Sequence, residues 1–273
     1  MSRFRNPVLS APLSGDGVRM LTVYSPALKS RADLTLYLPE GRHHQPLPLL
    51  ILLHGVYGSH WNWWALGRAP QTAQAMLQAG QIRPFAIAMP ADGLSGDGTG
   101  YLPHRAFDAE AWIAEEVPAC LGELLPTVRT DRFYLAGLSM GGYGALRLGM
   151  KYAHKVRGIS AHSAVTSVED LALFVDQPLE EYLNSGRENT QIEHWAKTNS
   201  AMLPPIRFDC GREDSLLDSN RKLHAMLLTH RIAHTYEEND GGHTWDYWQT
   251  HLRSTLRFFS AIEEGRGGVS AGV

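Results

Sequence analysis

Two hydrophobic patterns near the start of the chain predict a pair of β-strands. Residues 19–24 have the composition of a strand, and residues 32–38 alternate apolar and polar positions through Leu34, Leu36 and Leu38. A segment rich in turn-forming residues separates the two. We therefore expect them to form a leading antiparallel pair.

Six later segments, most of them apolar, have the length and composition of strands buried in a mainly parallel sheet. They are residues 48–53, 85–89, 133–138, 156–164, 206–211 and 234–238. Helix-forming stretches separate most of these segments. Strands that alternate with helices predict an α/β fold, here a mainly parallel, doubly wound sheet of eight strands with helices on both faces.

Two amphipathic helices stand out from the spacing of their apolar residues. Asp108 is placed to cap the N-terminus of a helix that extends to about Leu125, with Pro118 as a kink inside it. After the last predicted strand, apolar residues at helical spacing predict a closing helix. These residues are Trp248, Leu252, Leu256 and Phe259.

A single domain over residues 1–273 accommodates all of these elements. Residues 166–205 are polar and helix-prone, without a clear strand, so we interpret them as a small helical cap inserted between two strands. Residues 265–273 are rich in glycine, and we expect this tail to be disordered.

Composition and charge narrow the functional classes. With 25 basic and 28 acidic residues, the net charge of −3 gives no electrostatic reason to expect nucleic acid or an anionic membrane as a partner. Cys120 and Cys210 lack the spacing of a zinc site or a disulfide framework, so no metal is expected. No apolar run is long enough to span a bilayer and no signal-type segment is present, which favours a cytoplasmic location. A homo-oligomer is compatible with these features.

A Gly-x-Ser-x-Gly motif centred on Ser139 lies where an apolar run meets a helix-forming segment. A strand that turns sharply into a helix holds such a serine at a strained apex, and Gly137 and Gly141 permit the close approach. Ser139 is therefore the candidate nucleophile. The amide of Met140 and the positive end of the helix would face an oxyanion formed there. The motif alone also arises at ordinary strand-to-helix junctions, so further residues must support it.

Two other loops at strand ends carry the residue types that a serine nucleophile requires. A neutral imidazole must accept the serine proton, and a carboxylate must orient that imidazole and stabilise its charged form. His243 follows the last predicted strand and Asp214 the strand before it, which gives the order Ser, Asp, His along the chain. Glu213 and Asp218 are rivals for the acid, whereas Asp209 lies inside a strand.

The loop after residues 48–53 is expected to supply a second oxyanion donor, the backbone amide of Val56, beside that of Met140. Aromatic residues follow in the same loop. They cover the edge of the core or form an apolar pocket for an acyl or aryl group, and the two roles are compatible. The candidate pocket residues are Tyr57, His60, Trp61, Trp64 and Trp245.

A glycine-rich loop at residues 90–100 contains two aspartates. It has fewer acidic residues than a calcium-binding EF-hand loop and lacks the closing glutamate of such a loop, and it lacks the Gly-Lys-Ser/Thr of a P-loop. We expect it to form a flexible wall of the site rather than a metal or phosphate cradle.

These segments together resemble the esterase D branch of the α/β-hydrolases, which includes tributyrin-type esterases, S-formylglutathione hydrolases, feruloyl esterases and mycolyltransferases. The matching segments are residues 52–55, 89–93, 137–145, 210–214 with Asn220, and 241–245. The resemblance implies the α/β-hydrolase fold and a carboxylic ester hydrolase without a cofactor. It also implies Ser139, Asp214 and His243 as the triad, with Val56 and Met140 as amide donors.

Two features depart from this branch. Residues 56–58 read Val-Tyr-Gly where S-formylglutathione hydrolases tend to carry Leu-Thr-Cys, and residues 61–64 contain more tryptophan than is usual. We therefore expect a serine carboxylesterase that acts through an acyl-enzyme on a small-molecule ester with a short acyl or aryl group. The alternatives are a thioesterase or S-formylglutathione hydrolase, an acyltransferase using the same triad, and a non-catalytic binding protein with this fold.

Overall fold

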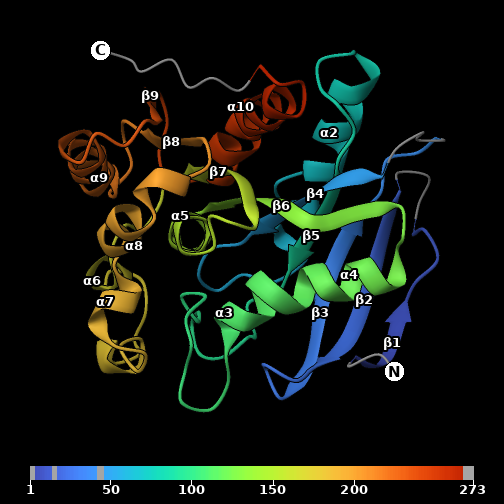
Figure 1. Ribbon diagram of the computed structural model, residues 1–273, viewed down its shortest axis with the longest axis horizontal. Helices are drawn as coiled ribbons and strands as arrows, with labels where there is room; N and C mark the ends of the chain where they lie inside the picture. The colour runs from blue at the N-terminus through green and yellow to red at the C-terminus, as the bar shows by residue number, and fades with distance from the viewer. Residues whose placement is uncertain (1–3, 14–16, 42–45, 267–273) are drawn as a thin grey trace.

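The computed structural model of the protein describes residues 4–13, 17–41 and 46–266. Within these residues, nine strands form one sheet in the order β1-β2-β3-β5-β4-β6-β7-β8-β9 (Figure 1). Their bounds are Arg5–Leu9 (β1), Val18–Ser25 (β2), Ser30–Tyr37 (β3), Leu47–Leu53 (β4), Ala86–Pro90 (β5), Val128–Leu138 (β6), Val156–His162 (β7), Ile206–Gly211 (β8) and Thr235–Asn239 (β9).

The sheet is antiparallel at its N-terminal edge and parallel elsewhere. β1, β2, β3 and β5 pair antiparallel in that order, and all pairs from β5 to β9 are parallel. The mainly parallel sheet and its leading antiparallel pair, β2 and β3, are confirmed. The expected count of eight strands is wrong, because β1 adds a ninth. The first four residues of β1 are exposed, so the strand leaves no hydrophobic pattern in the sequence.

Helices cover both faces of the sheet. Their bounds are Asn62–Ala65 (α1), Ala69–Gln78 (α2), Ala109–Ala111 (α3), Val117–Leu124 (α4), Met140–Lys151 (α5), Val168–Leu171 (α6), Arg187–Thr190 (α7), Ile192–Thr198 (α8), Leu217–Thr229 (α9) and Trp245–Glu263 (α10).

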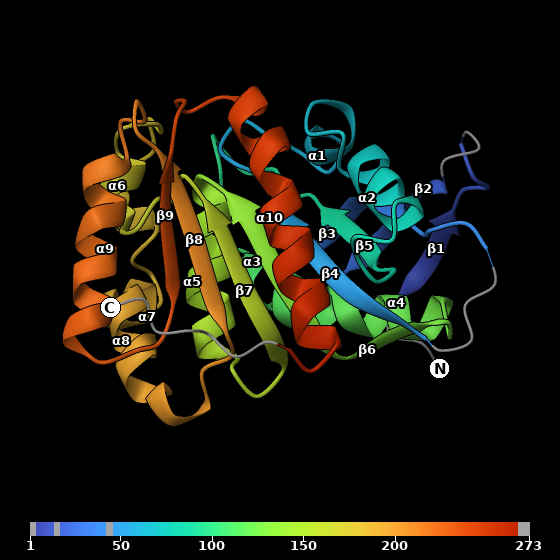
Figure 2. The same ribbon diagram turned by 90° about the horizontal axis from the view of Figure 1, so that it is seen from above.

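The two faces bury separate hydrophobic clusters because side chains alternate along each strand. In β4, Leu49, Ile51 and Leu53 belong to the cluster beneath α4 and α5, whereas Leu50 and Leu52 belong to the cluster beneath α2 and α10. Figure 2 shows α2 and α10 together on one side of the sheet, opposite α4 and α5. The layers are those of a doubly wound α/β fold.

The helix predicted from Asp108 to Leu125 forms, but it is not a regular α-helix. Asp108 caps it as expected, since its Oδ1 accepts the amide of Ala111 at 2.9 Å. Residues 112–116 then form a π-helical turn before α4 begins. Pro118 lies in the first turn of α4. A proline has no N–H to donate to the preceding turn, and the wider π-helical turn accommodates this loss.

Residues 166–205 connect β7 to β8, and none of them, all of which are described, lies in a strand. They contain α6, α7 and α8 and two short 3₁₀ turns. This helical insertion lies beside α5 and α9 at one end of the sheet (Figure 1).

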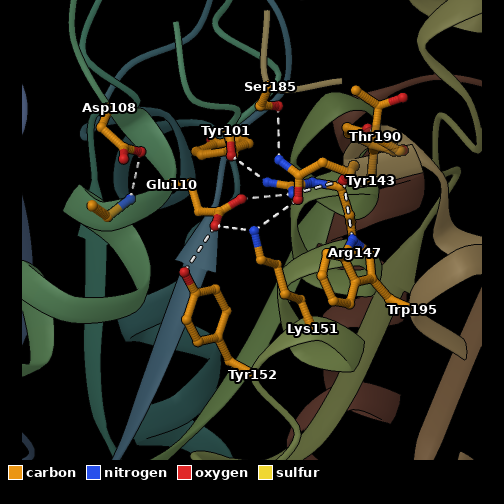
Figure 3. A network of polar contacts seen from close by, with 12 residues as sticks. Tyr101, Asp108, Glu110, Tyr143, Arg147, Lys151, Tyr152, Ser185, Thr190 and Trp195 are labelled. Carbon is orange, nitrogen blue, oxygen red and sulfur yellow. Dashed lines mark hydrogen bonds and ion pairs between the residues drawn. The ribbon is translucent and has the colours of Figure 1, made fainter. Parts of the chain in front are cut away.

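A buried charged network ties the insertion to the body of the protein (Figure 3). Glu110 of α3 accepts hydrogen bonds from Arg147 at 2.7 Å and from Lys151 at 2.6 Å, both on α5. The same two cations reach the insertion, where Arg147 donates to the carbonyl of Asn189 and Lys151 to its side-chain oxygen. The network fixes α3, α5 and α7 relative to one another.

The closing helix α10 buries one apolar stripe, which includes all four residues predicted for it. Gly265 and Arg266, the first residues of the predicted tail, bond back to the last turns of this helix through their backbone amides. Residues 267–273 lie outside the described residues. No helix in the described part of the chain is both long and apolar enough to cross a membrane.

Candidate active site

Ser139 sits at a sharp turn between β6 and α5. Its φ of 52° and ψ of −121° lie in a region that side chains other than glycine rarely adopt. A Cβ on Gly137 would meet the carbonyl oxygen of Gly141 at 2.3 Å, and a Cβ on Gly141 would meet the carbonyl oxygen of Leu53 at 2.3 Å. Both flanking glycines are therefore required by the backbone itself, and the strained serine points away from the sheet at the start of a helix.

The structure brings the three predicted residues Ser139, His243 and Asp214 together. His243 Nε2 lies 3.1 Å from Ser139 Oγ, and His243 Nδ1 lies 2.9 Å from Asp214 Oδ2. They come from the loops after β6, β9 and β8, at the carboxyl ends of parallel strands. The order of contacts is that of a nucleophile, a base and an orienting acid.

Asp214 is held as a carboxylate by its surroundings. Burial alone would raise its pKa, but the hydrogen bond and charge of His243, together with the amide of Leu216, keep the pKa below its usual value. The Leu216 amide donates to Oδ1 at 2.9 Å, which leaves Oδ2 for His243. The rivals Glu213 and Asp218 are exposed.

The predicted oxyanion donors lie on loops that meet beside the serine. Among the described residues, neither the amide of Val56 nor that of Met140 has a hydrogen-bond acceptor. The glycine-rich loop at 90–100 packs against the side chains of both residues. Gly98 lies so close to them that an added Cβ would be 2.5 Å from Met140 Sδ and 3.4 Å from Val56 Cγ1. The assignment of these two amides as oxyanion donors stays a prediction.

Asp92 shapes the glycine-rich loop from inside. Its carboxylate accepts the amide and hydroxyl of Thr99 at 2.7 and 2.9 Å and the amide of Leu94 at 2.9 Å. The loop was expected to form a flexible wall of the site. It contacts Val56 and Met140, and its role as a wall stays a prediction. The Asp92 carboxylate is occupied by the loop's own donors.

Two aromatic side chains surround the imidazole of His243. The ring of Phe174, from the insertion, stacks on it with centroids 5.6 Å apart and planes at 16°, and Trp248 approaches at 4.9 Å and 89°. Trp245, a predicted pocket residue, packs edge to face against Trp248 and Trp63. Sequence reasoning missed Phe174, because it lies in a segment without a periodic pattern and only the tertiary fold brings it to His243.

The other predicted pocket residues diverge in position. Tyr57 is 69% exposed, and its hydroxyl donates to the carbonyl of Phe174 above His243. His60 points instead to β3, where its Nδ1 lies 2.9 Å from Thr35 Oγ1, and burial lowers its pKa. Trp61 is 43% exposed, and Trp64 packs on the cluster beneath α2 and α10. Of these four residues, Tyr57 bonds to Phe174, the residue that stacks on His243.

Comparisons with known proteins identify the family of this chain. The model of the Esterase family, described as "Putative esterase", matches residues 25–259. A relative named acetyl esterase, from Caldicellulosiruptor saccharolyticus, is 26% identical over 279 aligned positions, which cover 90% of this chain and 99% of the relative.

Solved structures of ester hydrolases share the fold of this chain. The structure of a ferulic acid esterase is 26% identical, with a TM-score of 0.78 over 90% of this chain and 98% of that one. An S-formylglutathione hydrolase from Agrobacterium tumefaciens, 19% identical, has the same fold, with a TM-score of 0.79 over 95% of this chain and 99% of that one. This chain belongs to the Esterase family and is a carboxylic ester hydrolase with the α/β-hydrolase fold.

Proposed function

We propose that the protein is a serine carboxylesterase that hydrolyses short-chain acyl or aryl esters through an acyl-enzyme on Ser139. One observation carries the proposal. The hydroxyl of Ser139, held at a left-handed apex, lies 3.1 Å from an imidazole whose other nitrogen lies 2.9 Å from a buried carboxylate. A serine hydroxyl is a weak nucleophile near neutral pH, and such an arrangement removes its proton during attack.

In the first half of the reaction, Ser139 Oγ forms a bond to the carbonyl carbon of the ester while its proton moves to His243 Nε2. The carbonyl oxygen becomes an oxyanion that accepts hydrogen bonds from the amides of Val56 and Met140. The intermediate then collapses. Its bond to the alcohol oxygen breaks, and His243 returns the proton to that oxygen, so the alcohol leaves and the acyl-enzyme remains.

In the second half, water takes the place of the alcohol. His243 accepts a proton from water as the water oxygen bonds to the acyl carbon, and the same amides hold the second oxyanion. The bond to Ser139 Oγ then breaks and the proton returns to that oxygen, which releases the carboxylic acid. Throughout, the carboxylate of Asp214 holds Nδ1–H of His243 and stabilises the imidazolium that forms in each half.

The relatives support the substrate class. A protein named acetyl esterase and a structure named ferulic acid esterase, each 26% identical, point to small acyl and aryl esters. The tryptophan and tyrosine residues near His243 provide apolar surface for such groups.

Replacing Ser139 tests the proposal directly. Ser139→Ala should reduce turnover of p-nitrophenyl acetate and butyrate by at least about 10³-fold, because the acyl-enzyme cannot form. Labelling by a fluorophosphonate probe, which wild type should show, should be lost as well. Circular dichroism establishes that the variant is folded.

Two results would contradict the proposal. Turnover retained by folded Ser139→Ala would refute the role of the serine. Wild-type cleavage of p-nitrophenyl octanoate without cleavage of the acetate or butyrate would refute the short-ester class.

A further inference from the structure

Phe174 is the residue of the insertion that contacts the proposed base. Its ring lies almost parallel to the imidazole of His243, at 16° and a centroid distance of 5.6 Å. Trp248 meets the same imidazole at right angles. Two aromatic rings that pack on an imidazole limit its rotation, because close packing leaves little space for another orientation.

Residues 174–177, which we call the strap, are fastened to the two loops that flank the oxyanion donors. The hydroxyl of Tyr57, next to Val56, donates to the carbonyl of Phe174. On the glycine-rich loop, Asp97 Oδ2 accepts the amide of Asp176 at 3.0 Å, and the Asp97 amide donates to Gln177 Oε1 at 3.1 Å. The strap therefore contacts the proposed base through Phe174 and is bonded both to the loop that contains Tyr57 and to the glycine-rich loop.

A further bond joins the glycine-rich loop to the insertion. The buried Tyr182 donates its hydroxyl to the carbonyl of Gly98 at 2.7 Å. Gly98 is the residue that packs on Met140 and Val56. The insertion is thus joined by hydrogen bonds to the loops that carry Tyr57 and Gly98, and its Phe174 lies against His243.

We propose that Phe174 is a positioning residue for His243, and that the strap exists to hold it there. The inference rests on the proposed function, because it concerns His243 as the base. In the hydrolytic cycle His243 is neutral before attack and positively charged in both tetrahedral stages. The face of an aromatic ring attracts a cation more than a neutral group. Phe174 therefore stabilises the charged stage over the resting stage, in addition to fixing the ring's orientation.

Replacing the ring by an aliphatic side chain tests this role. Phe174→Leu should lower kcat for p-nitrophenyl acetate by about threefold to thirtyfold, the range that loss of one cation–π contact gives, while KM changes by less than about twofold. Phe174→Tyr keeps an aromatic face and should restore most of kcat. A residue that merely filled space would not show this split or this rescue.

A second variant tests the strap without changing the core. Tyr57 is exposed, so Tyr57→Phe leaves the fold intact and removes the hydroxyl bonded to Phe174. We expect a smaller loss of kcat, about twofold to fivefold. Leu173→Ala is the matched control, because Leu173 precedes the strap and is 66% exposed, and it should keep wild-type kcat.

The outcomes separate this inference from the proposed function. If wild type fails to react with a fluorophosphonate probe, the proposed function is wrong. If wild type and Phe174→Leu both react but kcat is unchanged in Phe174→Leu, the role of Phe174 alone is overturned. Equal losses in Phe174→Leu, Phe174→Tyr and Leu173→Ala would also overturn it, because they would indicate general loosening of the segment.

Discussion

At the scale of single residues, the acid of the proposed triad is distinguished from its neighbours by burial and by one hydrogen bond. Asp214 points its Oδ2 at His243 from a buried position, whereas Glu213 in the same loop and Asp218 in the first turn of α9 are exposed. The sequence places all three within reach of the strand end. It does not indicate which side chain turns inward, because that depends on the path of the loop.

Asp214→Asn should lower kcat/KM by about 10³- to 10⁴-fold, since an amide can present its N–H to Nδ1 and stabilise the wrong tautomer of the imidazole. Glu213→Gln and Asp218→Asn should each retain activity within about twofold, because neither carboxylate contacts His243. Steady-state kinetics with p-nitrophenyl acetate measures all three variants. A large loss in Glu213→Gln or Asp218→Asn, with activity kept in Asp214→Asn, would assign the acid to a rival.

Ser139, the proposed nucleophile, is the site residue that the sequence indicates most directly. Its motif encodes two steric requirements, a strained serine and two backbone contacts that only glycine permits, and both are local to a few residues. Phe174 is the opposite case. Its contact with His243 joins residues 69 positions apart in the chain, so no local pattern predicts it.

At the scale of elements, the buried ion network determines how the insertion is attached. Arg147 lies on a helix whose residues from Met140 to Met150 are all buried, so its charge depends on Glu110 for a partner. Burial would raise the pKa of Glu110, but the charges of Arg147 and Lys151 hold it below the usual value. The carboxylate is therefore ionised at neutral pH, and the three groups act as a unit (Figure 3).

Glu110→Gln should lower the free energy of unfolding by about 3–5 kcal/mol, because it leaves a fully buried guanidinium without its counter-charge. The matched control is Glu169→Gln, which breaks a pair with Arg187 in which both side chains are more than half exposed. That change should cost less than about 1 kcal/mol. Urea unfolding followed by tryptophan fluorescence measures the free energy of unfolding of both variants. Equal decreases in the two variants would contradict the claim that the buried ion pair stabilises the fold more than the exposed pair.

The sequence predicts an element well where the burial of its residues follows a regular pattern. The apolar runs of β4 to β8 indicate strands because both faces of the sheet are covered, and α10 shows its stripe because one face is exposed. β1 escapes prediction because it is an exposed edge strand that buries almost nothing. The irregular helix around Trp112 escapes because a π-helical turn has no distinctive composition.

At the scale of the whole molecule, a second Asp–His pair, which is buried, connects the neighbouring strands β7 and β8 with α10. Asp209 on β8 contacts His162 on β7 at 2.9 Å, Arg207 at 2.9 Å and the hydroxyl of Tyr247 on α10 at 2.9 Å. Burial would raise the pKa of Asp209, but His162 and Arg207 lower it to about 2. Tyr247 also packs on Gly241, in the loop that carries His243.

This network predicts how stability depends on pH. The pKa of Asp209 is lower in the folded protein than its ordinary value of 3.8, so its carboxylate stabilises the fold above about pH 4. That contribution, of the order of 2 kcal/mol, is lost as pH falls from about 4 towards about 2.

Asp209→Asn should lower the free energy of unfolding by about 3–5 kcal/mol at pH 7. The difference in this free energy between the variant and wild type should become smaller as the pH falls from about 4 towards about 2. Urea unfolding at pH 7, 4 and 2.5 measures it. Asp240→Asn, at a carboxylate 93% exposed, is the control and should match wild type throughout. A constant difference between Asp209→Asn and wild type at all three pH values would contradict the assignment.

The position of α10 has a consequence for the newly made chain. His243 lies two residues before this helix, and α10 covers one face of the sheet together with α2 (Figure 2). When the residues up to β9 have left the ribosome, Ser139 after β6 and Asp214 after β8 have already emerged, whereas His243 and α10 are still to come. The growing chain therefore lacks the proposed base while most of its sheet is free to assemble, and the proposed triad is complete only once the loop before α10 has emerged.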